Sequence, residues 1–354
     1  MSGESPVDET LCLLRTILNC KELPADWHRS YGLSPSRANA LANRKKDRNS
    51  FLNPQSETAL TTFLLCNLDR WHQVNTIHPK PRESDSSWSL PFFEAIRNNR
   101  QPLVQPRPDP CLWDAFLRSA FPHDFPPSTR SAVLLLEFEI LNWAFHPDSA
   151  DPKKAFRQLS FLPIDNQGEW SQFDAVLIVP HGNKGTLYFV EAKLHSDVST
   201  GTTKYPYVTQ IVRNLEAAFL LTRHSMSQYQ GWDFRYVFVC PKKALRYKAT
   251  YYAYALGEHG EAVQDTITNY SVLLSDEVHD WKDNTAKHNL FQAFREETPK
   301  RVAVVPWCEL AAIAASHSPE GFAGYRSLLK ECKELDESEK GRIDERFSAV
   351  GIMF

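Results

Sequence analysis

The segment "LYFVEAKLHS", Leu187 to Ser196, gives the clearest indication of the fold. Its first four residues are bulky, aromatic or β-branched, which favours a β-strand, and no turn-forming residue interrupts them. Glu191 and Lys193 follow, two residues apart. Because side chains on a strand alternate between faces, these two share a face, and His195 joins them if the strand continues. A strand with the character of a buried core strand therefore carries a carboxylate and an ammonium side by side.

A second strand precedes this one. The segment "FDAVLIVP" (residues 173–180) is apolar except for Asp174, and "HGNKG" (residues 181–185) has the composition of a turn. A short hairpin would bring the two strands together, because antiparallel neighbours lie about 5 Å apart. If Asp174 and Glu191 share a face, two carboxylates converge beside an ammonium. Two anions so close repel each other, and a bound cation is the usual remedy. Oxygen ligands favour Mg²⁺ or Mn²⁺ over zinc.

A third acid comes from the segment before the hairpin. "STRSAVLLLEFEILNWAFHP" (residues 128–147) is predicted to be a helix that ends at Pro147. At 100° per residue, Glu137 falls inside the apolar arc, whereas Glu139 falls on the opposite side. A buried carboxylate without a partner costs several kcal/mol, so Glu137 needs either a buried salt bridge or a place in a metal site.

A second helix is predicted after the hairpin, over residues 206–224. It offers Gln210, which shares one flank with Asn214 and with the small residue Ala217. An amide beside small residues could approach the carboxylates closely. Further apolar strands are predicted over residues 234–241 and 301–307, the latter followed by a helix from Glu309.

These elements predict an α/β or α+β fold with a mixed central β-sheet flanked by helices. We expect three regions: a helical N-terminal region (residues 1–105), the core (residues 106–315) and a helical C-terminal tail (residues 316–354). The N-terminal region includes a basic segment, residues 37–48, which is a solvated surface or a phosphate contact.

Composition excludes several classes. The chain is 42% hydrophobic and 23% charged, as in a globular protein, and its net charge of -3 excludes a general polyanion binder. Seven scattered cysteines without a CxxC spacing indicate free thiols in a reducing compartment rather than a disulfide framework or a structural zinc. The N-terminus lacks the basic start of a secretory signal, and no apolar segment reaches the roughly 20 residues of a membrane span. We expect a cytoplasmic protein with no membrane association.

The order of acids and amides resembles the PD-(D/E)XK nuclease superfamily, the restriction-endonuclease-like fold. The resemblance covers residues 128–245, and Phe173 stands where the family name has proline. It implies that Asp174, Glu191 and Glu137 bind one or two divalent metal ions, that Lys193 orients or activates the attacking water, and that Gln210 completes the catalytic site. His195 is not part of the general motif, and its role stays open.

The expected function is therefore Mg²⁺- or Mn²⁺-dependent hydrolysis of phosphodiester bonds by an endo- or exonuclease. The expected partner is nucleic acid, DNA before RNA, with a homodimer as an option. No G-x-S-x-G, P-loop, H-E-x-x-H or dinucleotide glycine motif points to other chemistry. Two alternatives remain: an inactive nucleic-acid binder with the same fold, and a scaffold or interaction protein whose helical N-terminus does the work, with the acidic cluster as a salt-bridge network.

Overall fold

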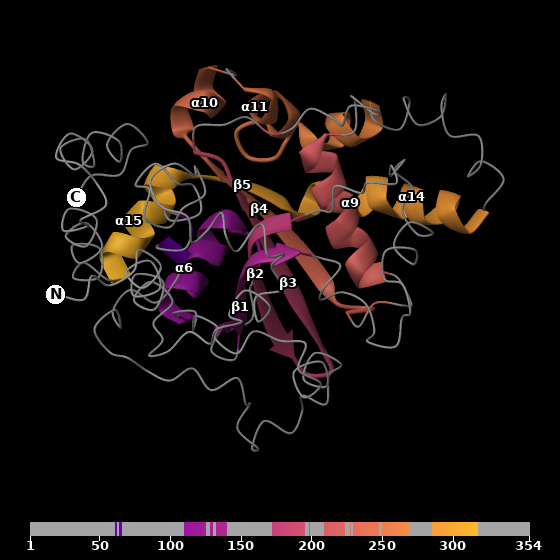
Figure 1. Cartoon of the computed structure of the whole chain (residues 1–354), viewed down its shortest axis with the longest axis horizontal. Coiled ribbons are helices and arrows are strands. Elements are labelled where there is room, and N and C mark those ends of the chain that lie inside the picture. The colour runs from indigo at the N-terminus through magenta and orange to yellow at the C-terminus, as the bar shows by residue number, and fades with distance from the viewer. Residues whose placement is uncertain are drawn as a thin grey trace, which may run out of the picture.

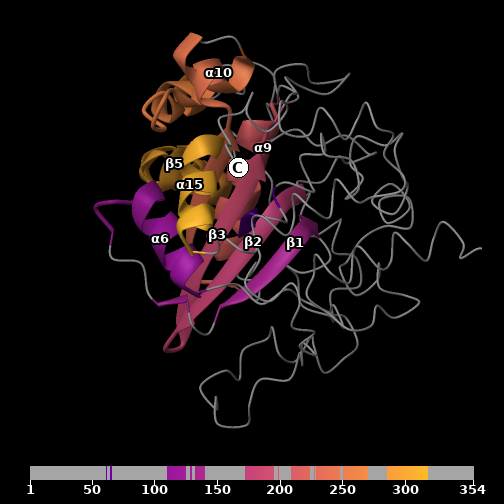
Figure 2. The ribbon, with the colours of Figure 1, turned by 90° about the vertical axis from the view of Figure 1, so that its left-hand side faces the viewer.

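The computed structural model describes residues 61, 64–65, 110–124, 128–129, 132–139, 172–194, 198, 209–223, 227, 229–247, 250–269 and 285–317. Over these residues the fold is α+β, a mixed sheet with helices on both faces (Figures 1 and 2). The elements are α6 (Pro110–Ala120), β1 (Val133–Glu139), β2 (Gln172–His181), β3 (Lys184–Ala192), α9 (Gln210–Arg223), β4 (Asp233–Cys240), α10 (Lys242–Tyr247), α11 (Tyr251–Leu256), α14 (Thr285–Glu297), η3 (Thr298–Arg301), β5 (Val302–Pro306) and α15 (Trp307–His317).

The strands follow one another across the sheet in chain order, β1-β2-β3-β4-β5. The first three form an antiparallel meander; β4 then pairs parallel with β3, and β5 pairs parallel with β4. A parallel neighbour requires a crossover, and α9 supplies the one between β3 and β4. The carboxyl ends of β3, β4 and β5 therefore meet at one edge of the sheet, which places Lys193 beside the segments that follow β4 and β5.

The predicted hairpin is confirmed. β2 and β3 pair antiparallel from Ala175 and Val190 out to His181 and Lys184. Gly182 takes a left-handed conformation (φ 58°) in the turn between them, a backbone that glycine adopts without steric cost.

The predicted helix over residues 128–147 is wrong at its centre, because Val133–Glu139 form β1. An apolar run of this length fits a buried helix or a buried strand, and "LEFE" (residues 136–139) alternates with the strand period of two. The segment is a strand because it pairs with β2, from Val133 opposite Ile178 to Glu139 opposite Gln172. Tertiary pairing overrides the helical spacing on which the position of Glu137 was predicted.

Two apolar cores hold the sheet between its helices. On one face, aromatic and aliphatic side chains of β2, β3, β4 and β5 form a continuous core with α9, α11 and α14. Phe219 of α9 stands edge-on to Phe234 of β4 and to Phe294 of α14, with ring centroids 6.4 and 5.5 Å apart. On the other face, α6 packs against α15. Glu191 belongs to the face that α9 covers, because it continues the alternation of Leu187 and Phe189, which both lie in the α9 core.

The N-terminal region contributes three described residues, Thr61, Leu64 and Leu65, which are helical and buried. The indole N–H of Trp113 in α6 donates to the backbone carbonyl of Leu65 at 3.0 Å. The rest of residues 1–105 and the tail after residue 317 lie outside the described residues. Among the helices that the structure describes, none has the length and apolar character that a membrane crossing requires.

Candidate active site

The centre of the candidate site is the carboxylate of Glu191, which is only 2% exposed. Three donors converge on it. The ammonium of Lys193 and the amide of Gln210 both lie 2.7 Å from Oε1, and the amide of Asn214 lies 3.1 Å from Oε2. Burial of an uncompensated carboxylate would cost several kcal/mol, and these donors offset that cost. We call Asp174, Glu191, Lys193, Gln210 and Asn214 the carboxylate cluster.

The backbone of Lys193 is fixed on both sides. Its N–H donates to the carbonyl of Val239 in β4 at 2.8 Å, and its carbonyl accepts the indole N–H of Trp307 at 2.9 Å. Trp307 is fully buried at the start of α15. Two elements beyond β3 therefore hold the position from which the lysine amine reaches Glu191, and Lys193 itself is 8% exposed.

Asp174 lies on β2, the strand next to Glu191. Regular pairing of β2 with β3 ends at Ala175 and Val190. Beyond that point a carboxylate oxygen of Asp174 accepts the backbone N–H of Ala192 at 2.7 Å, in place of a ladder carbonyl. This bond ties the Asp174 side chain to the residue that follows Glu191, so the two acids of the predicted motif lie on adjacent, directly linked strand ends.

The amides come from the first turns of α9. Thr209 precedes the helix, and its side chain accepts the N–H of Val212 at 3.3 Å, which satisfies one of the unpaired N–H groups of the first turn. Gln210 is the first helical residue, and Asn214, 1% exposed, lies one turn later on the same flank. Because a helix N-terminus carries partial positive charge, this end of α9 also favours the negative charge of Glu191.

Glu137 is in line with Asp174 and Glu191, but it lies on the strand β1 and not on the helix that was predicted. Leu136 pairs with Ala175 and Phe138 pairs with Phe173, so the register places the backbone of Glu137 across from Asp174. Extending the β2–β3 register by one residue likewise sets Asp174 across from Glu191. Three acidic positions thus follow one another across β1, β2 and β3. The side chain of Glu137 lies outside the described residues, and among those described no group of three His, Cys, Asp or Glu side chains is arranged to hold a metal ion.

Tyr236 of β4 is a site neighbour that the sequence did not single out. It is fully buried, and its ring centroid lies 6.3 Å from that of Phe173. Burial raises the pKa of its hydroxyl well above the ordinary value, and the negative charge of Glu191 raises this pKa further. Asn214 is close enough to lower that pKa. Even so, no hydrogen bond of ordinary geometry reaches the Tyr236 hydroxyl within the described part of the chain.

Other predicted features lie elsewhere. β3 ends at Ala192, and His195 lies outside the described residues, as does the basic segment 37–48. Between Gly257 and Glu261 the chain turns, and the Glu261 carboxylate accepts the backbone N–H groups of Glu258 and His259 at 3.0 and 2.7 Å. That carboxylate serves the turn rather than the candidate site.

A cavity of about 810 Å³ is lined in part by the outer strand β5, and it does not coincide with the carboxylate cluster. Its floor includes Val304 and Val305, and its rim carries charges of both signs, among them Lys242, Arg246 and Glu309. None of the five residues of the carboxylate cluster lines it. The chemistry of the carboxylate cluster and the volume of this cavity are therefore separate features.

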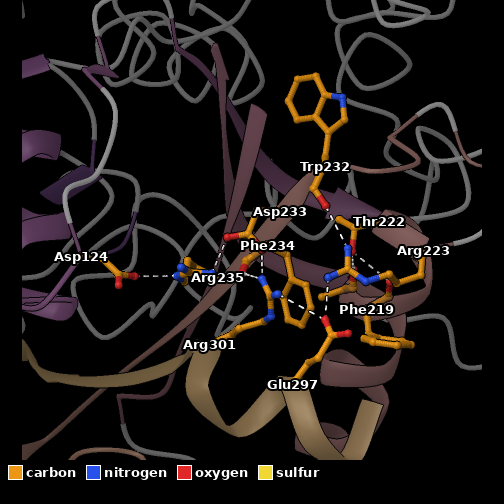
Figure 3. Close-up of polar contacts among 11 residues, drawn as sticks. Asp124, Phe219, Thr222, Arg223, Trp232, Asp233, Phe234, Arg235, Glu297 and Arg301 are labelled. Atoms are coloured by element: carbon orange, nitrogen blue, oxygen red, sulfur yellow. Dashed lines mark hydrogen bonds and ion pairs between the residues drawn. The ribbon is translucent and has the colours of Figure 1, made fainter. Parts of the chain in front are cut away.

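A second polar cluster lies at the other end of the parallel strands (Figure 3). We call it the arginine cluster; its members are Asp124, Arg223, Asp233, Arg235, Glu297 and Arg301. Asp233 opens β4 and pairs with both Arg235 and Arg301. Glu297 forms ion pairs with Arg223 at 2.6 Å and with Arg301 at 3.2 Å. Asp124 forms an ion pair with Arg235 at 2.9 Å. Three cations thus balance three anions.

Aromatic rings complete the arginine cluster. The guanidinium groups of Arg223, Arg235 and Arg301 lie 5.7, 5.8 and 5.2 Å from the ring centroids of Phe219, Phe121 and Phe234, respectively. Burial lowers the pKa of Arg301, and the neighbouring charge of Arg223 lowers it further. Arginine stacked on rings and paired with carboxylates is typical of a structural junction, here between α9, β4 and the α14–η3 segment.

Comparison of the chain with known protein families, with curated proteins and with solved structures finds no match in any of the three.

Proposed function

We propose that the protein is a divalent-metal-dependent nuclease that hydrolyses phosphodiester bonds, with DNA as its substrate, in the manner of the PD-(D/E)XK superfamily that the sequence resembles. The observation that carries the proposal is the convergence of Lys193, Gln210 and Asn214 on Glu191, beside Asp174. These residues come from β2, β3 and α9, in the order that the resemblance implies. The scattered cysteines without a CxxC spacing support a cytoplasmic location, and a homodimer stays an option.

The donor set fits a hard cation. Asp174 and Glu191 offer carboxylate oxygens from adjacent strand ends, and Glu137 occupies the next register position on β1. Carboxylate oxygens are the ligands that Mg²⁺ and Mn²⁺ prefer. Asp174, Glu191 and Glu137 are therefore the residues that would hold the ion. Such an ion lowers the pKa of bound water and offsets the charge that develops at phosphorus.

The remaining residues position these carboxylates and the substrate. The Lys193 ammonium is 2.7 Å from Glu191, and Lys193 directly follows the end of β3, so it can donate to a phosphate oxygen or to an attacking water beside that carboxylate. Gln210 and Asn214 hold the orientation of Glu191 from the helix side. Trp307 and Val239 fix the lysine backbone and hence the reach of its amine.

The deciding experiment incubates the full chain with circular duplex DNA, linear duplex DNA, single-stranded DNA and RNA, each with Mg²⁺, Mn²⁺ or EDTA. Cleavage that requires the metal and disappears in Asp174→Asn, purified identically, is the expected result. Asp174→Asn keeps the size of the side chain but removes the charge that a cation needs. Cleavage that persists in Asp174→Asn, or no cleavage by the wild type under any condition, removes the proposal.

One observation favours the second candidate, a nucleic-acid-binding or scaffold protein without hydrolysis. Both oxygens of Glu191 already accept hydrogen bonds, so the carboxylate cluster is also a satisfied buried ion-pair network. On this reading Lys193→Ala changes stability and shows no metal-linked effect. Mobility shifts of DNA by wild-type protein that cuts nothing, unchanged by EDTA, would establish it.

A further inference from the structure

The cavity along β5 has the size of a ligand site. β5 is the outermost strand of the sheet that the structure describes, and four consecutive residues of it, Ala303 to Pro306, line the cavity. α10 lies on one side of β5 and α6 on the other (Figures 1 and 2). The volume of about 810 Å³ lies in the range of about 300–1,000 Å³ that ligand sites have. At about 3.3 Å per residue, the cavity follows β5 for roughly 13 Å.

Three exposed cations line this cavity: Lys242, Arg246 and Lys300. Lys242 and Arg246 lie one turn apart on α10, just after the end of β4 that pairs with Pro306. Lys300 lies in η3, just before β5 begins. The cations therefore stand at both ends of the part of β5 that lines the cavity. Fixed positive charges spaced in this way favour a ligand with several negative charges, such as a chain of phosphates.

The three acids that line the cavity offset these cations only in part. Asp124 pairs with Arg235 at 2.9 Å, and Arg235 does not line the cavity. Glu309 lies in the first turn of α15, where the helix N-terminus favours its charge, and it accepts the hydroxyl of Ser119. The third acid is Glu258, on the turn after α11. The charge that the cavity offers to a ligand is therefore positive.

The cavity also has an apolar floor, formed by Val304 and Val305 of β5 together with Leu245 of α10. Bare phosphate gains nothing from apolar surface, whereas a nucleotide base presents an apolar face to it. In a duplex the bases are paired and stacked, so only phosphates would reach the cavity. An unpaired strand offers phosphates and bases together, the combination that single-strand binding grooves use. The lining therefore fits a single strand better than a duplex.

A peptide strand fits the same place less well. A peptide that extends a sheet needs accessible N–H and C=O groups along the outer strand. Ala303, Val304 and Val305 are only 4%, 7% and 2% exposed. The turn at Gly260 covers the start of β5, since a Cβ on that glycine would lie 2.9 Å from the Val302 carbonyl oxygen. A ligand in this cavity therefore contacts the side chains of its walls rather than a free strand edge.

One end of the cavity lies next to the carboxylate cluster. Val305 pairs with Val239, whose carbonyl accepts the N–H of Lys193 at 2.8 Å. Two strand spacings, or about 10 Å, therefore separate the Lys193 backbone from the cavity floor. Trp307, the residue after Pro306, connects the two through its bond to the Lys193 carbonyl. A distance of about 10 Å is the length of about three stacked nucleotides.

We propose that this cavity binds consecutive nucleotides of a single-stranded nucleic acid and directs that strand toward the carboxylate cluster. Lys242, Arg246 and Lys300 contact its phosphates, and the apolar floor contacts its bases. The direction toward the carboxylate cluster rests on the proposed nuclease function. Binding of the strand does not require hydrolysis, so it is tested without metal.

The first test measures the affinity of the full chain for a labelled oligothymidylate of about 12 nucleotides, by fluorescence anisotropy in EDTA. Lys242→Gln should lower the affinity about eightfold at 0.05 M salt, and should make the slope of log affinity against log salt shallower by about 0.7. The matched control is Lys243→Gln, an equal change of charge at an exposed lysine of the same helix that does not line the cavity. It should change the affinity by less than about twofold.

A second test changes volume and leaves charge unaltered. Ala120→Phe places a ring in the cavity from the last residue of α6. It should lower the affinity by about 10-fold or more, the contribution of at least one base. The control is Ala312→Phe, at an exposed position of α15 that does not line the cavity, and it should leave the affinity unchanged. Urea unfolding checks that each variant is folded, and the lysine pair decides the inference if Ala120→Phe is not.

The outcomes separate this inference from the proposed function. Equal losses for Lys242→Gln and Lys243→Gln, or a wild type that does not bind the oligothymidylate, overturn the inference. Displacement of the oligothymidylate by thymidine monophosphate at the same nucleotide concentration identifies a site for free nucleotides and also overturns it. Cleavage of duplex DNA without oligothymidylate binding removes the inference alone. Binding that Lys242→Gln weakens, without cleavage of any substrate in Mg²⁺ or Mn²⁺, supports the inference and removes the proposed nuclease function.

Discussion

The carboxylate cluster and the arginine cluster lie at opposite ends of the same parallel strands and are built on opposite plans. The carboxylate cluster directs three donors onto one buried acid, Glu191, and includes a single cation, Lys193. The arginine cluster matches three arginines with three acids, and its members are partly exposed, with side-chain exposures of 18% for Arg301 and 35% for Asp233. Six residue steps along β4, from Asp233 to Val239, separate the two ends by about 20 Å.

The difference in plan indicates a difference in role. In the arginine cluster each charge already has a partner of opposite sign, so the cluster does not favour a further charged ligand. It joins segments that range from residue 124 to residue 301. A cluster that holds one carboxylate in place, with a second from a neighbouring strand, keeps negative charge in a fixed position. Fixed charge that requires no reorganisation is the property that catalysis uses. Variants in both clusters test this difference in role.

The largest expected effect is on activity. Asp174→Asn should lower the rate of DNA cleavage by at least about 100-fold, because it removes charge from the reacting centre. The matched carboxylate in the arginine cluster is Asp233, and Asp233→Asn should change the rate by less than about twofold. Initial cleavage rates of both variants at saturating Mg²⁺ test the pair. A loss in Asp233→Asn as large as that in Asp174→Asn would erase the distinction between the clusters.

The next effect is on stability and belongs to the arginine cluster. Arg301→Met should lower the free energy of unfolding by about 1–3 kcal/mol, since Asp233 and Glu297 each lose a charged donor. The control is Arg118→Met on α6, where the exposed arginine donates to the carbonyl of Asp114 within its own helix. Arg118→Met should stay within about 0.5 kcal/mol. Urea unfolding of both variants measures the difference, and equal losses would contradict the assignment of a structural role to Arg301.

A third effect links pH to the arginine cluster. Burial raises the pKa of Tyr188 from 10.0 to about 12, while Arg235 opposes and Asp124 adds to this rise. Because the folded-state pKa is the higher one, the neutral phenol stabilises the fold; this contribution is complete below pH 10 and is lost as the pH rises toward 12. Unfolding free energy should fall by about 1.4 kcal/mol for each pH unit in this window. Tyr188→Phe should flatten that slope, whereas the buried Cys240 thiol, whose pKa is also raised to about 12, would still contribute.

The smallest expected effect is the response to salt. The Debye length falls from about 10 Å at 0.1 M to about 3 Å at 1 M, which screens partly exposed charges more than buried ones. The stability loss of Arg301→Met should therefore shrink by about 0.5 kcal/mol in high salt. The loss of Glu191→Gln should stay constant, because Glu191 is 2% exposed. Urea midpoints at low and high salt compare the two variants; a salt-sensitive Glu191→Gln would show that water reaches the carboxylate cluster.

Sequence patterns predicted most of the sheet for a clear reason. β2, β3, β4 and β5 are short, strongly apolar runs bounded by turn residues, and such runs have few alternatives. The neighbouring placement of Asp174 and Glu191 followed from one short turn. β1 was missed because "VLLLEFE" suits a helix as well as a strand until a partner strand is known.

The support around the carboxylate cluster could not be predicted from the sequence alone. Trp307 follows an apolar strand 114 residues after Lys193, and only the parallel pairing of β4 with β5 brings it there. Tyr236 alternates with Phe234 and Phe238 and so looks like one more core aromatic. The arginine cluster was missed for the same reason, since its six members are dispersed between residues 124 and 301.

The bond from the Trp113 indole to the Leu65 carbonyl has a practical consequence for dissecting the chain. A fragment that begins at residue 106 would keep the sheet and every residue of the carboxylate cluster. It would also strip α6 of the buried Leu64 and Leu65 and leave a buried indole N–H without its acceptor. A shortened chain that fails to fold would therefore show the loss of part of the core, so variants that test the role of Glu191 and its neighbours belong in the intact chain.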